Sequence, residues 1–300
     1  MKNIDRLILT VAFLTGSTVV GQDMPLSQVL NEGDNWEVVG SGYNYTEGPA
    51  VDPDGNVYFS DVPNSVIYRI DIARKVSEFA KDTQRTNGLM FGPKGLYGCR
   101  MADRQIVVYS KDGKTVTPIA TDVDCNDLVV NSKGEVYFTD PKAEQVWFID
   151  AGGNKKVVAK GFRPNGIILW PMEGTLVVTD YSEPHLWTFR VEADGTLSNR
   201  ERYYLPLQVP SGADRPGSDG MTVDHAGRLY VATAAGIQMW DPTGRLGGTI
   251  ARPEGIKPSN VVFGGADFNY LYATCKGKVF RRKTKSKGVP YFQLSKSGRK

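Results

Sequence analysis

The sequence is poor in residues that bind soft metals or cross-link small domains. It has only two histidines and three cysteines, Cys99, Cys125 and Cys275, in 300 residues, and no two cysteines stand in a CxxC spacing. No zinc cluster is readable from such a pattern. One disulfide is possible, but the sequence does not identify its partners, and buried free thiols are the simpler interpretation.

Long apolar runs are also missing, and the longest candidate lies at the start. Lys2 and Arg6 precede a short apolar segment, residues 7–14, and small and polar residues follow. This pattern predicts a secretory signal peptide over residues 1–21, with cleavage before Gln22. The apolar segment is too short for a membrane span. We therefore expect an exported protein, periplasmic or secreted, with no membrane span after signal removal; an uncleaved anchor or a disordered start is the alternative.

Acidic residues are absent from the C-terminal end. Residues 276–300 hold ten Lys or Arg and no Asp or Glu, so residues 1–275 carry 26 basic and 33 acidic residues, a net charge of −7. An acidic body argues against nucleic acid as a partner. We interpret residues 284–300 as a basic, solvated tail.

Turn residues are abundant and evenly spread, with 33 glycines and 17 prolines. Six segments begin with a polar residue, enter an apolar strand, and reach a tight turn such as DPDG at 52–55. Their first residues, which we call the heads, are Glu47, Asn87, Asn126, Asn165, Asp219 and Asn260. The intervals are 40, 39, 39, 54 and 41 residues. Repeats of this length with several short strands predict an all-β, six-bladed β-propeller, with four antiparallel strands per blade, over residues 35–283.

Two irregularities in the repeat carry information. The last unit shows only three strands, and the apolar segment 36–40 before the first head is unassigned, so we expect it to complete the sixth blade and close the ring. Closure removes exposed sheet edges. The long fourth interval implies an insertion over residues 199–217, which we expect near the functional site.

The heads predict a ring of oxygen atoms. Inner strands of a propeller all run in the same direction, so their starts gather at one mouth of the channel. Two carboxylates, Glu47 and Asp219, with the amide of Asn165 suit a hard divalent cation. The lack of His and Cys at the heads argues against a dedicated zinc or copper site. The alternative is that Asn-Gly and Asp-Gly simply begin strands as turn residues.

Four segments resemble one known family, the SMP-30/gluconolactonase/LRE family. They are TEGPAVDPDGNVYFSD at 46–61, NDLVVNSKGEVYFTDP at 126–141, PNGI at 164–167 and SDGMTVDHAGRLYVAT at 218–233. The resemblance implies a six-bladed propeller with one divalent cation, held by Glu47, Asn165 and Asp219. We expect calcium, with magnesium, manganese and zinc as alternatives. It also implies that Asn126 contacts substrate and that Asp219 assists proton transfer.

One position departs from the family pattern. Some members have an arginine two residues before the asparagine of the N-D motif, where this sequence has Asp124. Arg100 is a candidate to supply a cation instead. Together with Asn126 and Asn87, it forms our predicted set of substrate-binding residues.

The resemblance implies hydrolysis of a sugar lactone, a gluconolactonase-like carboxylic ester hydrolysis. A cation at the mouth would polarise the ring carbonyl, and Asp219 would orient or deprotonate water. Two alternatives stay open: another metal-dependent ester or phosphotriester hydrolase, and a non-catalytic propeller that binds a sugar or a protein. The sequence identifies neither the lactone nor the oligomeric state.

Overall fold

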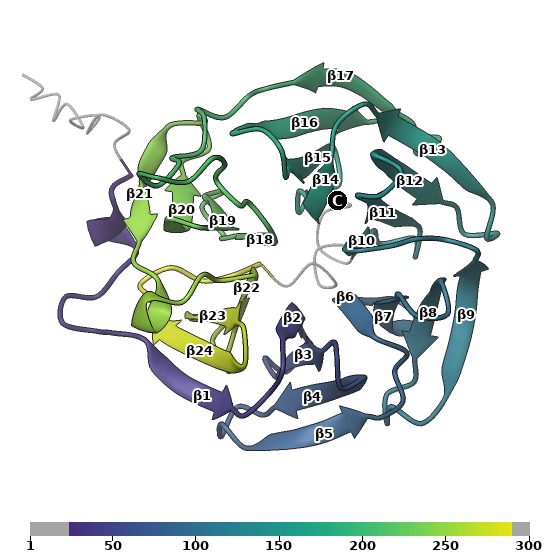
Figure 1. The fold of residues 1–300 in the computed structure, drawn as a ribbon, viewed down its shortest axis with the longest axis horizontal. Coiled ribbons are helices and arrows are strands. Elements are labelled where there is room, and N and C mark those ends of the chain that lie inside the picture. Colours follow the sequence, from purple (N-terminus) through teal and green to yellow (C-terminus); the bar gives the residue numbers. More distant parts are fainter. Residues whose placement is uncertain (1–23, 290–300) are drawn as a thin grey trace, which may run out of the picture.

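Six four-stranded antiparallel sheets surround one axis in the computed structural model, which describes residues 24–289 (Figure 1). The predicted six-bladed, all-β propeller is therefore confirmed. The predicted signal peptide, residues 1–21, lies outside the described residues, so export stays a prediction. No helix within residues 24–289 is long and apolar enough to cross a membrane.

Each blade runs outward from the channel, as the order of strands in its sheet shows. The inner strands are β2 (Thr46–Val51), β6 (Thr86–Gly92), β10 (Leu128–Val130), β14 (Pro164–Leu169), β18 (Met221–Val223) and β22 (Asn260–Gly264). The second strands are β3 (Val57–Asp61), β7 (Gly95–Arg100), β11 (Val136–Asp140), β15 (Thr175–Asp180), β19 (Leu229–Thr233) and β23 (Tyr270–Cys275). The third strands are β4 (Val66–Ile70), β8 (Gln105–Tyr109), β12 (Gln145–Ile149), β16 (Leu186–Val191), β20 (Gly236–Trp240) and β24 (Lys278–Lys283).

The outer strands complete the blades. They are β5 (Val76–Ala80), β9 (Val116–Thr121), β13 (Lys155–Lys160), β17 (Leu197–Glu201), β21 (Leu246–Ile250) and, for the sixth blade, β1 (Glu37–Ser41). Two 3₁₀ helices, η1 (Leu26–Gln28) and η2 (Pro253–Gly255), lie outside the sheets.

The sixth blade closes the ring with the N-terminal strand. β1 pairs antiparallel with β24, Glu37 opposite Arg281, and Figure 1 shows it along the outer edge of that blade. The Arg281 guanidinium donates two hydrogen bonds to Glu37 Oε2, at 3.1 and 3.0 Å. The predicted closure by the segment around residues 36–40 is confirmed.

Alternating side chains fill the space between blades. On β11, Tyr137 packs with Leu169 and Leu176 of the fourth blade, whereas Phe138 packs with Tyr97 of the second. Successive strand residues point to opposite faces, so each second strand serves two interfaces. All five residues of β11 are buried. The ring is thus a rigid support for whatever lies at its mouths.

The cysteines and the start of the basic tail are packed. Cys99 and Cys125 share one apolar cluster, Cys275 lies in another, and all three are buried and free. Residues 284–289 stay on the propeller, because Thr284 bridges to Leu30 and Gly288 to Asp224. The first part of the predicted tail is therefore held against the sixth and fifth blades.

Candidate functional site

The glycine after a head allows the next blade to approach. A Cβ on Gly166 would collide with the carbonyl oxygen of Asp219, and one on Gly220 would collide with the side chain of Asn260. Only glycine permits so close a backbone approach. The Asn-Gly and Asp-Gly pairs therefore bring heads of neighbouring blades together around the channel.

Two predicted ligands, Glu47 and Asp219, form a poorly compensated pair of carboxylates. Burial raises the pKa of Glu47 well above its usual range, and the negative charges of Asp219 and then Asp127 raise it further. Burial also raises the pKa of Asp219 to about 7, although the charge of Lys257 partly offsets this. Only 14% of the Asp219 side-chain surface is exposed. Negative charge therefore accumulates at this mouth with little solvent to screen it.

Asn165 joins these carboxylates. Its buried Nδ2 donates to the carbonyl oxygen of Ser218 at 3.2 Å, and a hydrogen bond from its side chain lowers the pKa of Asp219. The amide nitrogen is thus engaged, which leaves Oδ1 as an acceptor. The structure brings together Glu47, Asn165 and Asp219, from three different blades.

This donor set fits a hard divalent cation. It offers oxygen atoms only, and a cation would relieve the repulsion between two buried carboxylates. Across residues 24–289, no three His, Cys, Asp or Glu side chains are grouped as metal ligands. A site here therefore depends on the Asn165 amide beside the two carboxylates. The ligand role of the three residues stays a prediction.

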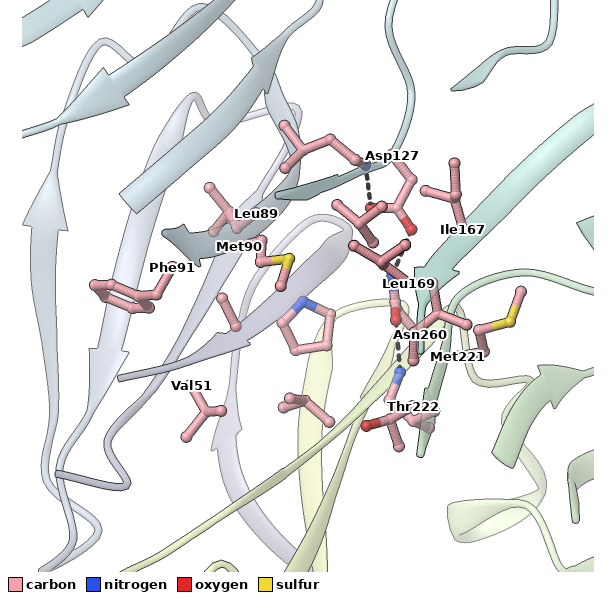
Figure 2. Close-up of a pocket in the computed structure, with 17 residues that line it drawn as sticks. Val51, Leu89, Met90, Phe91, Asp127, Ile167, Leu169, Met221, Thr222 and Asn260 are labelled. Carbon is pink, nitrogen blue, oxygen red and sulfur yellow. Dashed lines mark hydrogen bonds between the residues drawn. The ribbon is translucent and has the colours of Figure 1, made fainter. Parts of the chain in front are cut away.

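Asp127 is a third carboxylate that the sequence analysis missed (Figure 2). Its Oδ1 accepts from the Leu128 N–H at 2.9 Å, and its Oδ2 accepts from Asn260 Nδ2 at 3.4 Å. Burial raises its pKa to about 7. It stands where four other repeats have glycine after the head, and a Cβ on Gly88 would collide with it. The aspartate at the position where four other repeats have glycine was the sequence signal that could have identified Asp127.

Below Asp127 the channel is narrow and apolar. This cavity, about 70 Å³ in volume, is lined by residues including Met90, Leu169 and Met221 (Figure 2). Such a lining offers water few hydrogen-bonding partners. The polar mouth is therefore backed by a mostly apolar channel.

The three predicted substrate-binding residues lie in different surroundings. Asn126 is partly exposed beside Asp127, and Asn87 is buried with Nδ2 at 3.7 Å from Met101 Sδ. Arg100 forms an ion pair with Asp103, with 2.6 Å between Nη2 and Oδ2. Its charge is thus already matched within its own blade. The structure does not test the role of any of them, so their contact with substrate stays a prediction.

Lys257 and Tyr45 are mouth residues that the head pattern does not reveal. Lys257 Nζ lies 3.8 Å from Asp219 Oδ2. Burial raises the pKa of the Tyr45 hydroxyl, and the charges of Glu47 and Asp219 add to this, which locates Tyr45 beside both. Neither residue is a head, so only the fold brings them to the site.

The insertion after β17 reaches the mouth with its last residues only. Ala213, Arg215 and Gly217 line a hollow of about 540 Å³ together with Tyr181 and Lys257. The earlier part packs on the fifth blade, where the Leu205 N–H donates to Gly244 O at 2.9 Å. The expectation that the insertion lies near the site holds for residues 213–217.

Comparison with known proteins matches residues 45–277 to the family described as "SMP-30/Gluconolactonase/LRE-like region". The gluconolactonase of Zymomonas mobilis is 27% identical, over 88% of this chain and 85% of its own length. The pentonolactonase of Haloferax volcanii is 25% identical, over 80% of this chain and 84% of its own.

Solved structures agree on the fold. A gluconolactonase of Xanthomonas campestris superposes with a TM-score of 0.75 at 23% identity, covering 86% of this chain and 92% of that one. A calcium-binding protein, regucalcin, of Agrobacterium tumefaciens gives 0.70 at 18% identity, covering 85% and 96%. The family match spans most of the repeat, and the chain belongs to the SMP-30/gluconolactonase/LRE-like family.

Proposed function

We propose that this protein hydrolyses the lactone of a sugar acid at the mouth of its channel, with one divalent cation, calcium first, held by Glu47, Asn165 and Asp219. The convergence of these three oxygen-bearing side chains from three blades is the observation that carries the proposal. The lactonases among its relatives support the reaction class.

The cation, when bound, supplies a Lewis acid for the ring carbonyl and stabilises the developing oxyanion. Asp219 lies at the boundary between the buried mouth and the hollow, so its carboxylate can accept the proton of an attacking water. Lys257 holds that carboxylate from the solvent side. Asn126 is a partly exposed head, and we expect its amide to bind sugar hydroxyls.

No covalent nucleophile is needed. Ser218 is adjacent to Asp219, but it is fully buried and its Oγ donates to the carbonyl oxygen of Asp180 at 3.0 Å. A hydroxyl engaged in this way, without an adjacent base, is not activated for attack. Direct attack by water therefore fits the site.

The test is acid release from a panel of aldonolactones, beginning with glucono-1,5-lactone and corrected for spontaneous hydrolysis. The protein is first chelated and then given calcium, magnesium, manganese or zinc. We expect turnover that the cation restores and that Asp219→Asn abolishes. Asp54→Asn, in an exposed hairpin turn, is the matched control. Cation binding without hydrolysis of any lactone overturns the proposal and favours a binding propeller. Activity on aryl esters or phosphotriesters alone favours a different hydrolase.

A further inference from the structure

We infer that the substrate carries an acid group, a carboxylate or a phosphate, at the end of the sugar remote from the lactone carbonyl. The group binds to three cations beside the mouth, Arg163, Arg215 and Lys257, which we call the cationic rim. This inference rests on the proposed function, because it names the substrate class of the same site.

Two guanidinium groups of the rim share one aromatic ring. Arg163 Cζ lies 4.8 Å and Arg215 Cζ 4.3 Å from the ring centroid of Tyr181. The Tyr181 N–H also donates to the carbonyl oxygen of Arg163 at 2.8 Å. Cation–π attraction holds each guanidinium in place but does not remove its charge. Both charges are therefore held at the same aromatic ring.

The charges of this pair are not matched within the protein. Within the part of the chain that the structure describes, Arg100, Arg228 and Arg281 form ion pairs with carboxylates, whereas Arg163 and Arg215 form none. One carboxylate, Asp214, lines the same hollow without an ion pair to either guanidinium, and Asp214, Arg163 and Arg215 are all exposed. Guanidinium groups without a carboxylate partner can bind an anion, because the anion offsets their positive charge.

The rim is continuous with the site. Arg215, Tyr181 and Lys257 line one hollow of about 540 Å³, a size typical of small-molecule sites. Lys257 Nζ also lies 3.8 Å from Asp219 Oδ2. A Cβ on Gly217 would lie 3.4 Å from that nitrogen, so the segment that carries Arg215 is folded against Lys257. One ligand can therefore touch both Asp219 and the rim.

Arginine forks bind carboxylate and phosphate with two parallel hydrogen bonds. A sugar acid whose far carbon is oxidised or phosphorylated presents such a group while its other end forms the lactone. The carboxylates of the mouth would repel this anion, whereas the cations of the rim attract it. The arrangement thus orients the substrate with its lactone inward and its acid group outward.

The experiment compares two pairs of lactones that differ only at the remote carbon. They are galactaro-1,4-lactone against galactono-1,4-lactone, and 6-phosphoglucono-1,5-lactone against glucono-1,5-lactone. We expect kcat/KM to be about tenfold higher for the acid member of at least one pair, as one charge-assisted contact gives. The pair with the larger ratio identifies carboxylate or phosphate. Raising the ionic strength lowers the ratio.

Substitutions in the rim test whether its arginines cause the preference for acid lactones. Arg215→Gln and Arg163→Gln each lower the acid-to-neutral ratio about tenfold, mainly through KM of the acid lactone. Arg200→Gln is the matched control, because Arg200 also stacks on an aromatic ring, 3.8 Å from the Trp187 centroid, but lies on the outer strand β17. It leaves the ratio unchanged.

The outcomes separate this inference from the proposed function. If neutral and acid lactones are hydrolysed equally, or if the Arg variants leave the ratio intact, the inference is wrong and the lactonase proposal stands. If no lactone is hydrolysed, the lactonase proposal is wrong. Calorimetry with galactarate and galactonate then decides: tighter binding of galactarate that Arg215→Gln removes supports the rim, and equal binding overturns it.

Discussion

The fifth blade has an aspartate at each end of its inner strand β18, and the two differ in how many hydrogen-bond donors and cations surround their carboxylates. Asp224, in the hairpin turn, accepts from the Arg228 guanidinium at 3.1 Å, the Tyr230 hydroxyl at 2.9 Å and the Ala226 N–H at 2.9 Å. Asp219, at the mouth, has Lys257 at 3.8 Å and the Asn165 amide. A carboxylate saturated with hydrogen-bond donors stabilises the fold. An undersupplied carboxylate, one with few donors, is available to a ligand.

The largest effect is expected from a change at the undersupplied carboxylate, Asp219. Asp219→Asn removes the proton acceptor and one ligand charge, so we expect turnover to fall about 10²–10⁴-fold. The free energy of unfolding of the chelated protein does not fall, because a repelling buried charge is lost. Rates of lactone hydrolysis and urea unfolding of the same samples measure both. A large loss of stability would show that Asp219 serves the fold as Asp224 does.

The next largest effect is expected from a change at the saturated carboxylate, Asp224. Asp224→Ala leaves the buried Arg228 guanidinium without its carboxylate, so we expect the free energy of unfolding to fall by about 3–5 kcal/mol. Turnover per folded molecule is unchanged, since the change lies at the opposite end of the strand. Denaturant unfolding and active-site titration check the two statements. A stable variant with impaired turnover would reverse the comparison.

A smaller effect concerns how the heads approach one another. Gly166→Ala places a methyl group against the carbonyl oxygen of Asp219, which we expect to cost about 1–3 kcal/mol of stability and to weaken calcium binding. Gly174→Ala, in the same blade, is the control, because a Cβ there meets no atom within 4 Å. Equal behaviour of the two variants in unfolding and calcium titration would contradict the role of the head glycine.

The smallest effect is a pH dependence of stability that comes from Asp127, a third buried carboxylate beside the mouth. Burial raises the pKa of Asp127 to about 7 in the folded protein, whereas an unfolded aspartate ionises near 3.9. The folded state therefore holds a proton that the unfolded state releases, so the free energy of unfolding falls as pH rises from about 4 to about 7. For the chelated protein we expect Asp127→Asn to reduce this slope by about 1 kcal/mol per pH unit. An unchanged slope in urea unfolding from pH 4.5 to 7.5 would show that Asp127 ionises normally.

Much of the fold was predictable, because a propeller blade is built from local pattern. The interval near 40 residues, the turns such as DPDG, and the unassigned segment 36–40 predicted six blades and their closure, and the strand pairing confirms both. Asn165 and Asp219 were predictable as neighbours at one mouth, since both begin inner strands. Their contact is the Asn165 side-chain hydrogen bond that lowers the pKa of Asp219.

Side chains outside the head pattern were not predictable in the same way. The sequence did not reveal that Asp103, three residues further on, pairs with Arg100; a contact of Arg100 with substrate stays a prediction. Lys257 has no special position in the repeat, but the loop before β22 carries it to Asp219. Such contacts depend on loop paths, and spacing along the chain does not determine those paths.

The sequence by itself determined the period, the strands and the ring of polar heads, because apolar alternation and turn residues act over a few neighbouring positions. Only the tertiary structure decided which charges meet. It placed Asp127 against the head Asn260, Lys257 beside Asp219, and Arg163 and Arg215 on the ring of Tyr181. Asp127 and Asn260 are 133 positions apart in the chain, and they meet because the blades are arranged in a closed ring.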